Sequence, residues 1–489
     1  MTPHNRSLLG DMSPDEFREY GHRLVEWIAG YLATAERYPV LSRLAPGEFA
    51  ASLPAAPPTD GEPFADVMRD LDERLVPALT HWNSPNFFAY FAITASAPGV
   101  LGEFLSAALN QQAMLWRTSP AATELETVVL GWLRQMMGLP PAFEGVIYDT
   151  ASVSSLHALA AARERAVPDV RGAGLAGRDL PPLRVYCSEH AHSSIDKAVI
   201  LLGLGHGALV KVRADREFRM DPSALARAIA ADRAAERLPL AVVATTGTTS
   251  TTSVDPVAEI AEICEREHLW LHVDAAYGGA AAIVPGWEWV LDGCARADSL
   301  VVNPHKWLFT PFDLSAFYCR HMDVLRAAFS LVPEYLRTTD PSGVRNLMDT
   351  GVQLGRRFRA LKLWMIIRYF GVEGLRARIA EHMRLARLFA EWVDGDPGFE
   401  RLAPVPMSVV CFRARPPGRD WLEPELEAFN ARLLDAVNAS GEAMLSHTKL
   451  DGRYAIRLAI GHIRTTEDHV ARVWALLQRV SAELLEVAS

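Results

Sequence analysis

Hydrophobic residues recur at helical spacing close to the N-terminus. Ser13 can cap a helix here, Pro14 suits its first turn, and Glu16 completes a capping box. The apolar positions that follow lie on one face of this helix: Phe17, Tyr20, Leu24, Trp27, Ile28, Tyr31 and Leu32. We therefore predict an amphipathic helix whose apolar face packs against another surface. A proline-rich linker follows over residues 54–63.

The middle of the chain alternates short β-branched runs with helical patterns. The expected strands are Leu183–Cys187, Leu240–Thr246, Trp270–Asp274 and Leu300–Asn303. This alternation predicts an α/β fold, with a mostly parallel sheet covered by helices on both faces. Ligands of such sheets bind at the carboxyl ends of the strands. Polar residues stand at those ends, namely Asp274, Asn303 and the run Thr245–Thr252.

The chain after Val372 has a different pattern. It reads as helix-rich α+β structure, and the runs VVCFRAR and YAIRLAI are expected to be strands of a small C-terminal sheet. A length of 489 residues also exceeds that of one ordinary domain. We therefore expect more than one domain.

Composition narrows the classes of function. Apolar residues make up 49% and charged residues 22%, which is typical of a globular protein. The 49 basic and 59 acidic residues give a net charge of −10, which argues against nucleic acid or an anionic membrane as a partner. No uncharged apolar run reaches the length of a membrane span or a signal peptide. The five cysteines are scattered without a CxxC pair, which argues against a disulfide scaffold or a metal site and favours a reducing, cytoplasmic location.

The segment Asn303-Pro304-His305-Lys306-Trp307 is the first candidate for chemistry. Lys306 stands among apolar and aromatic neighbours just past an expected buried strand. An arbitrary lysine here is most often one that extends its amine to solvent. Apolar surroundings also disfavour the ammonium form, however, and produce the nucleophilic amine of a Schiff-base lysine.

The second candidate is Asp274, which ends the apolar run Trp270–Asp274. Such an aspartate often caps a turn. It can also pair with the nitrogen of a pyridinium ring, and an ionised carboxylate there keeps the ring protonated and able to accept electrons. Ala275 and Ala276 are small enough for a flat ring to lie on the backbone. An aspartate, a strand and then a lysine in this order suit pyridoxal phosphate.

A phosphate group would need backbone N–H groups and hydroxyls at a helix start. The run Thr150–Ser155 precedes a helical stretch and offers both, although it is equally consistent with an ordinary capped helix. Thr248, Thr249 and Ser250 offer further hydroxyls. His192 opens another helix, where it is either a structural residue or one that stacks on the cofactor ring.

Taken together, these motifs resemble those of the pyridoxal-phosphate-dependent group II amino-acid decarboxylases, in particular the aromatic-L-amino-acid decarboxylases. The matching segments are THWNSPNFFAYF, TSPAATELE, AHSS, HVDAAYGG, NPHKWL, PEYL and LGRRFRALKLW. The resemblance covers nearly the whole chain. It implies fold type I, with an N-terminal helical dimerisation segment (1–96), a large cofactor domain with a seven-stranded sheet (97–371) and a small α+β C-terminal domain (372–489). It also implies a homodimer with active sites at its interface.

The resemblance assigns roles residue by residue. It implies that Lys306 is the Schiff-base lysine, that Asp274 pairs with the pyridinium nitrogen and that His192 stacks on the ring. Tyr335, on a loop over about 331–349, falls where the family places the acid that protonates Cα. The remaining cofactor contacts that it implies are Ala151, Ser152, Thr249, Ala276, Asn303 and His305.

The expected reaction is decarboxylation of an aromatic L-amino acid to the arylalkylamine and CO₂. Candidate substrates are tryptophan, 5-hydroxytryptophan, DOPA, tyrosine and phenylalanine. The side-chain pocket is expected to include Trp82, Tyr90, Phe91, Gln112, Trp116 and Gly355. An aromatic aldehyde synthase, a decarboxylase of another side-chain class and a catalytically silent dimer that binds the cofactor remain alternatives.

Several positions depart from the family pattern. Gln112 replaces an apolar pocket residue, and its side chain is expected to accept a hydrogen bond from an indole N–H or a phenol. Arg117 is expected to pair with Glu124 or Glu126. Asp149 stands beside the expected phosphate site, where a carboxylate would repel the phosphate, so we expect it to point away.

Overall fold

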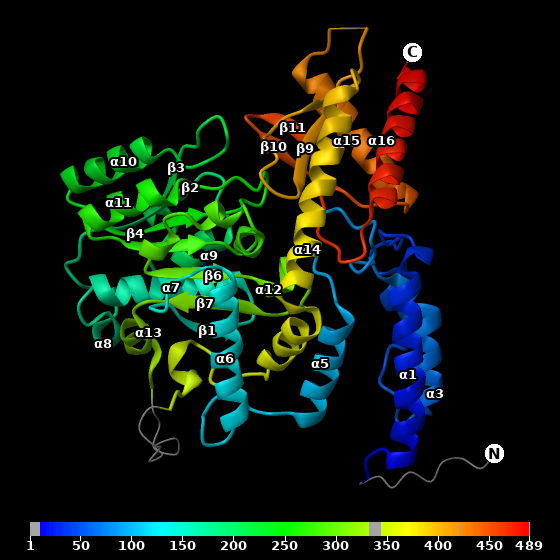
Figure 1. The fold of residues 1–489 in the computed structure, drawn as a ribbon, viewed down its shortest axis with the longest axis horizontal. Coiled ribbons are helices and arrows are strands. Elements are labelled where there is room, and N and C mark those ends of the chain that lie inside the picture. The colour runs from blue at the N-terminus through cyan, green and yellow to red at the C-terminus, as the bar shows by residue number, and fades with distance from the viewer. Residues whose placement is uncertain (1–9, 332–343, 419, 489) are drawn as a thin grey trace.

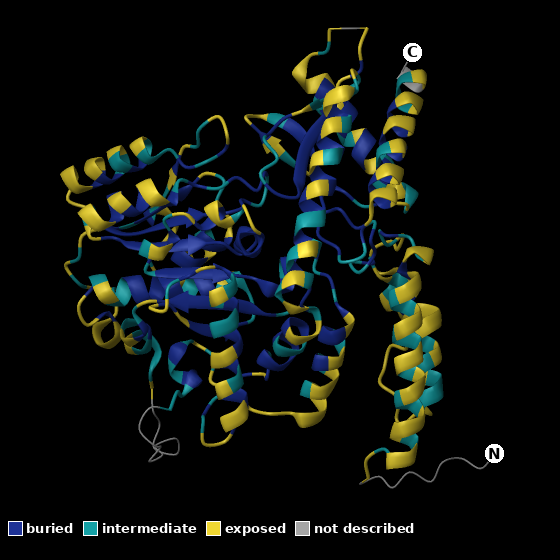
Figure 2. Cartoon of the chain, viewed as in Figure 1, coloured by how far each residue is buried: buried dark blue, intermediate teal, exposed yellow. Residues whose placement is uncertain are grey.

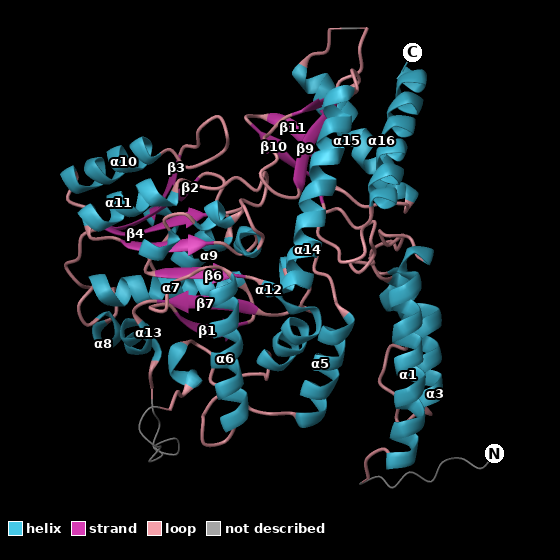
Figure 3. Ribbon diagram, viewed as in Figure 1, coloured by secondary structure: helices cyan, strands magenta, loops and turns pink. Residues whose placement is uncertain are grey.

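The computed structural model describes residues 10–331, 344–418 and 420–488. Figure 1 shows a central sheet flanked by helices, a smaller C-terminal sheet with its own helices, and an N-terminal helical arm that stands apart from the sheet. The arrangement of helices and strands is that of an α/β protein (Figure 3).

The N-terminal arm consists chiefly of α1 (Pro14–Thr34) and α3 (Phe64–Asp70), which lie side by side. The capping box is confirmed, because the Glu16 N–H donates to Ser13 Oγ at 3.2 Å and the Ser13 N–H donates to Glu16 Oε2 at 3.1 Å. No residue of α1 is buried (Figure 2). On its predicted apolar face Phe17 is exposed, and the other six residues are only partly buried. Short helices follow in this region: α2 (Glu48–Ser52) and α4 (Val76–Ala78).

The central sheet has seven strands in the order β1-β7-β6-β5-β4-β2-β3. Neighbours from β6 through β5, β4 and β2 to β3 are parallel, whereas β7 runs antiparallel to both β6 and β1. The expected mostly parallel, seven-stranded sheet is thus confirmed. The strands are β1 (Glu144–Tyr148), β2 (Leu183–Ser188), β3 (Leu209–Val212), β4 (Leu238–Thr245), β5 (Trp270–Asp274), β6 (Ser299–Val302) and β7 (Ser315–Cys319).

Helices cover both faces of this sheet because alternate strand residues point to opposite sides. In β4, Val242 and Ala244 pack in a core with α6, α11 and the first half of α14. Their neighbours Ala241 and Val243 pack with α7, α9 and α13 on the other face. The helices of this part are α5 (Ala97–Leu109), α6 (Pro120–Met136), α7 (Ala151–Ala166), α8 (Val170–Ala173), α9 (Ser194–Leu201), α10 (Pro222–Ala234), α11 (Val257–Glu267), α12 (Pro304–Trp307) and α13 (Met322–Phe329).

The C-terminal part is built on a second, antiparallel sheet of order β10-β11-β9-β8. Helix α14 (Ala360–Gly395) connects it to the first core, and Gly371 interrupts this helix with a left-handed φ of +63°. The other elements are β8 (Phe399–Arg401), β9 (Val409–Ala414), α15 (Glu423–Ser440), β10 (Ser446–Leu450), β11 (Arg453–Ala459) and α16 (Glu467–Ala488). Both strands predicted after Val372 are therefore present. None of the helices in the described ranges is long and apolar enough to cross a membrane.

Candidate active site

The carboxyl ends of three neighbouring parallel strands meet at one cavity of about 180 Å³. Thr245 ends β4, Asp274 ends β5, and Asn303 directly follows β6. Lys306 enters the same cavity from the short helix α12, which begins right after Asn303. The cavity is lined by Phe91, Thr150, Ala151, Ser152, His192, Thr245, Gly247, Thr249, Asp274, Ala276, Tyr277, Asn303, His305 and Lys306. Every cofactor contact expected from the sequence therefore lies in this lining.

Lys306 has the surroundings of a nucleophilic amine. Burial lowers the pKa of its amine below the usual value, while the nearby charge of Asp274 acts in the opposite direction. Its Nζ lies 5.1 Å from the centre of the Phe91 ring. A lowered pKa increases the fraction of neutral amine, which is the form that attacks a carbonyl carbon.

Asp274 stabilises a turn and also lines the cavity. Its Oδ1 accepts a hydrogen bond from the Ala276 N–H at 3.1 Å, so it does stabilise the turn after β5. The side chain nevertheless lines the cavity and is only 6% exposed. A carboxylate fixed by one oxygen in a buried cavity is well placed to pair with a cationic group of a ligand.

His192 and His305 line the cavity as neutral rings. Desolvation lowers the pKa of His192, and burial lowers that of His305 to about 3. The Nδ1 atom of His192 accepts a hydrogen bond from the Ser194 N–H at 3.1 Å, and His305 Nδ1 accepts one from the Leu314 N–H at 2.9 Å. These backbone contacts fix the orientation of both rings.

Unpaired polar atoms in the cavity show that its residues fit a polar ligand. Thr245 Oγ1 and Asn303 Oδ1 are buried and have no hydrogen-bond partner in the described parts of the chain. Buried polar groups are normally satisfied, so two such atoms in one cavity indicate a bound group. Ala151 and Ser152 form the first turn of the 16-residue helix α7, whose N-terminus attracts an anion. The donor set fits pyridoxal phosphate.

An aromatic column supports one wall of the cavity. Phe91 stacks on Tyr277 with ring centres 3.8 Å apart, and Tyr277 stacks on Trp307 at 4.5 Å. The Tyr277 hydroxyl is hydrogen-bonded to Ser408 at 2.5 Å, which ties the column to the C-terminal part. This column fixes the ring of Phe91 beside Lys306.

The expected substrate pocket is only partly assembled in the single chain. Of its predicted residues, Phe91 lines the cavity with Lys306. Trp82 and Tyr90 stack on each other, with ring centres 5.7 Å apart, but neither is in the lining. Gln112, Trp116 and Gly355 are outside the lining of this cavity. Tyr335 lies outside the described residues.

Gln112 is held by a backbone hydrogen bond. Its Oε1 accepts from the Arg356 N–H at 2.6 Å, and this oxygen has a second lone pair, so the expected bond from an indole or a phenol stays a prediction. The NH₂ group of the amide is a donor. It lies next to Gly355, where an added Cβ would be 3.0 Å from Nε2. Gln112 and Gly355 thus share one small site, and that site offers a hydrogen-bond donor.

The expected ion pair of Arg117 is wrong. Glu124 accepts from the Trp116 indole at 2.7 Å, and Glu126 forms a buried ion pair with Arg356 at 2.8 Å. Neither carboxylate forms an ion pair with Arg117 in the described parts of the chain. Asp149, by contrast, is outside the cavity lining as expected, and its Oδ2 accepts from Gln353 at 3.1 Å.

Two contributors to the site were not expected from the sequence. Tyr277 belongs to the motif HVDAAYGG but was assigned no role. Its position three residues after Asp274 was the signal that it lies at the site. Arg457 is the other, with a buried guanidinium that donates to the carbonyls of Thr249 at 2.5 Å and Ser250 at 2.8 Å. An arginine in the centre of an apolar strand run was the available signal for it.

The fold and this cavity together define a class of protein. The seven-stranded sheet is mostly parallel, Asp274 ends β5, and Lys306 follows the neighbouring strand β6 and lines the same cavity. This is the arrangement of pyridoxal-phosphate enzymes of fold type I. The pyridoxal-dependent decarboxylase conserved domain matches residues 46–415. The chain therefore belongs to the pyridoxal-dependent decarboxylase family, and its enzyme class is that of a carboxy-lyase with pyridoxal phosphate as cofactor. The family expected from the motifs is confirmed.

Individual relatives agree along nearly the full length. The chain is 39% identical to the aromatic-L-amino-acid decarboxylase of Catharanthus roseus, over 99% of this chain and 98% of that protein. It is also 39% identical to a phenylacetaldehyde synthase of Arabidopsis thaliana, over 98% of each chain. A crystal structure of Oryza sativa TDC with PLP and tryptamine superposes with a TM-score of 0.94, at 37% identity and over 97% of this chain and 99% of that one.

Proposed function

We propose that the protein decarboxylates an aromatic L-amino acid to the arylalkylamine and CO₂. The observation that carries this proposal is the juxtaposition of Lys306, Asp274 and the Phe91 ring in one buried cavity. An aromatic wall beside the reactive amine favours a flat aromatic side chain, because ring stacking contributes about 0.5–1.5 kcal/mol beyond area burial. Relatives that act on aromatic amino acids, and the rice structure that holds tryptamine, support the same substrate class.

Pyridoxal phosphate, when bound, supplies a ring that accepts the electron pair of the breaking Cα–carboxylate bond. Lys306 would hold the cofactor through its amine. Asp274 would keep a proton on the ring nitrogen and so stabilise the negative charge that develops. His192 would stack on the ring and fix its tilt. The proton transfer to Cα that is expected of Tyr335 stays a prediction, since that residue lies outside the described ranges.

The phosphate is assigned to the opposite end of the cavity. Ala151 and Ser152 offer backbone N–H groups at the start of α7, and Thr249 offers a hydroxyl from the turn after β4. Asn303 and His305 complete the polar end, and the small Ala276 leaves room for the ring.

A substrate panel with separate detection of amine, CO₂, ammonia and peroxide tests this function. We expect one or more of tryptophan, 5-hydroxytryptophan, DOPA, tyrosine and phenylalanine to give equal amounts of amine and CO₂. Glutamate serves as the non-aromatic control. Because aldehyde synthases are among the relatives, ammonia and peroxide are the products to watch. The cofactor-loaded protein would contradict the proposal if it formed no amine from any aromatic substrate.

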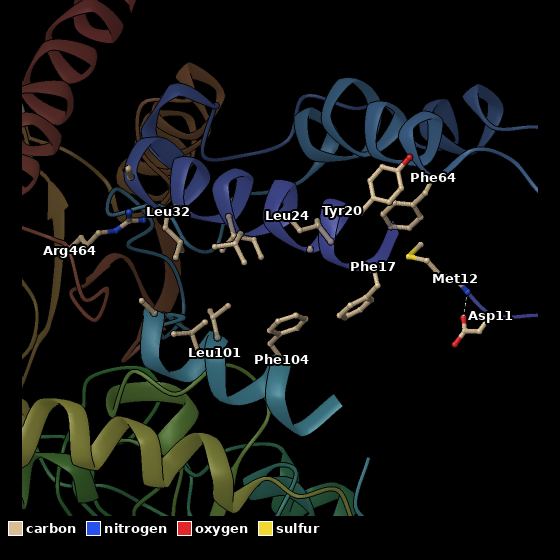
Figure 4. A pocket seen from close by; sticks show the side chains of 17 residues that line it. Asp11, Met12, Phe17, Tyr20, Leu24, Leu32, Phe64, Leu101, Phe104 and Arg464 are labelled. Carbon is tan, nitrogen blue, oxygen red and sulfur yellow. Dashed lines mark hydrogen bonds between the residues drawn. The ribbon is translucent and has the colours of Figure 1, made fainter. Parts of the chain in front are cut away.

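We also propose that the protein is a homodimer with its active sites at the interface. Helices α1 and α5 face each other across an apolar cavity of about 850 Å³ (Figure 4). Its walls include Phe17, Leu24, Leu101 and Phe104, and apolar surface on this scale usually marks an interface. A second copy of the chain is also the natural source of the pocket residues that the single chain keeps apart from Lys306. The domain division at residues 96 and 371 is retained as part of this proposal.

Sedimentation equilibrium tests the dimer. The wild type is expected to have twice the mass of one chain, and Leu101→Asp, which places a charge in the apolar cavity, is expected to shift it toward one chain and reduce activity at least about tenfold. Leu201→Asp, at the exposed end of α9, is the matched control and should remain dimeric. A wild type with the mass of one chain would overturn the proposal.

A cytoplasmic location is proposed on the cysteines. All five, Cys187, Cys264, Cys294, Cys319 and Cys411, are free and buried in the structure. Free thiols are typical of proteins in a reducing compartment. Thiol counting on freshly isolated protein checks this directly, and fewer than five reactive thiols after unfolding would count against it.

A further inference from the structure

Asp255 is a buried carboxylate just behind the active-site cavity and outside its lining. It is 2% exposed, and no described cation lies within ion-pair distance of it. Both of its oxygens accept from backbone N–H groups, Oδ2 from Thr245 at 2.8 Å and Oδ1 from Met220 at 2.7 Å. Its own N–H donates to the Thr245 carbonyl at 2.9 Å. Asp255 and Thr245 are thus joined by two hydrogen bonds at the end of β4.

Thr245 connects Asp255 to the cavity. It ends β4, pairs in register with Asp274 on β5, and directs an unpaired hydroxyl toward the cavity. The next residue donates its N–H to the Asp274 carbonyl at 2.9 Å. A shift of Thr245 would therefore move the backbone that carries Asp274.

The turn between Thr245 and Asp255 carries Thr249, the residue assigned to the phosphate. The turn is closed by N–H donation from Gly247 and Thr248 to the Ser253 carbonyl at 2.9 and 3.0 Å. Thr252 within it has a φ of +58° although it is β-branched and buried, which costs backbone energy. A strained turn keeps its shape only when its ends are fixed, and Asp255 fixes one of them.

The second hydrogen bond of Asp255 reaches the segment that carries His192. Met220 belongs to a hairpin closed by the Ala214–Met220 bridge. Phe218 in this hairpin packs edge-on against His190, with ring centres 5.5 Å apart, and Ala214 donates its N–H to Glu189 at 2.6 Å. The Asp255 carboxylate thus connects the end of β4 and the phosphate turn with the hairpin that packs against the His192 segment.

We propose that Asp255 is a positioning residue that holds these three segments at the spacing that pyridoxal phosphate requires. It contacts neither the cofactor nor the substrate, and it acts through Thr245 and Met220. The inference rests on the cofactor site proposed above. It predicts that Asp255 governs the affinity for pyridoxal phosphate much more than the turnover of the loaded enzyme.

The chemistry of the site requires a carboxylate rather than an amide. A carboxylate accepts with both oxygens, whereas asparagine has one acceptor oxygen and one NH₂ group. Asp255→Asn would turn that NH₂ toward a backbone N–H and leave one of the two buried donors unsatisfied. Burial raises the pKa of Asp255 to about 6, so the acceptor form still predominates at neutral pH.

The apoenzyme is prepared from the full-length holoenzyme and titrated with pyridoxal phosphate. Visible absorbance measures the binding. We expect Asp255→Asn to raise the apparent Kd about tenfold or more, with kcat at saturating cofactor changed less than about threefold. Asp232→Asn is the matched control, because Asp232 is another buried aspartate, bound by Tyr186 and Arg184 and outside the cavity lining. It should lower the melting temperature while leaving the Kd within about twofold of the wild type.

Each outcome decides a separate question. Asp255→Asn with wild-type affinity would overturn the positioning role, whereas a wild-type apoenzyme without affinity for pyridoxal phosphate would overturn the cofactor site itself. Should Asp255→Asn fail to fold, Asp255→Glu replaces it, since it keeps the charge but displaces the carboxylate by one methylene group. It too is expected to bind the cofactor more weakly, and unchanged affinity would reject the proposal.

Discussion

Lys306→Ala is expected to lose the visible absorption of the purified protein and to lower turnover roughly 10³-fold or more. The reason is that Lys306 is the only lysine in the lining of the described cavity. Burial lowers the pKa of its amine there, and Asp274 lines the same cavity. Alanine removes both the covalent attachment of the cofactor and the amine that releases the product. Absorbance spectra and single-turnover amine formation measure the two losses separately.

The control for this substitution is Lys449→Ala. Lys449 lies on β10, is half-exposed and pairs with Glu427 at 2.6 Å, away from the cavity. It should keep both the spectrum and the turnover of the wild type. Visible absorption that persists in Lys306→Ala without added amine would remove the lysine assignment.

Asp274→Asn is expected to reduce kcat about 10²–10³-fold, the usual effect of losing one preorganised electrostatic contact in a buried site. Asparagine has nearly the same shape and can keep the hydrogen bond to the Ala276 N–H. It carries no charge, however, and so does not hold a proton on the ring nitrogen. The loss should therefore appear in kcat, with a smaller rise in the Kd of pyridoxal phosphate.

Asp298→Asn is the matched control, at the amino end of β6 and so at the opposite end of the strands from the cavity. Asp298 precedes β6 and accepts from the Leu271 N–H at 2.7 Å, so its substitution affects the packing of the strands but not the cavity. It is expected to lower the melting temperature with little change in kcat. Equal losses of kcat in the two variants would show that Asp274 acts through structure rather than charge.

Four of the seven strands, β2, β4, β5 and β6, and the reactive end of the site followed from local patterns. Buried strands read as β-branched runs, and parallel strands bring their carboxyl ends to one edge, which places Asp274, Asn303 and Lys306 together. The capping box at Ser13 was equally predictable because it depends on residues three apart.

Contacts that depend on distant segments were not predictable in this way. Arg117 was expected to pair with Glu124 or Glu126, but Trp116 and Arg356 occupy those carboxylates. The acceptor oxygen of Gln112 likewise binds a backbone N–H that lies 244 positions away in the sequence. The donor that binds a given carboxylate or amide is determined by tertiary packing. Sequence spacing does not predict this partner.

The antiparallel edge of the sheet illustrates the same limit for topology. β1 pairs with β7, although more than 160 residues separate Glu144–Tyr148 from Ser315–Cys319. β7 also pairs antiparallel with β6, the strand before it in sequence, whereas β1 has no partner near it in sequence among the described strands. Their pairing depends on closure of the whole domain, which the hydrophobic pattern of each run does not specify.

The attachment point of the cofactor tests the central claim most directly. Borohydride reduction of the holoenzyme makes the cofactor–lysine bond permanent, and peptide mass spectrometry then locates it. The account predicts the phosphopyridoxyl group on Lys306. Its recovery on another lysine, or its absence from the protein after reconstitution with pyridoxal phosphate, would contradict the account.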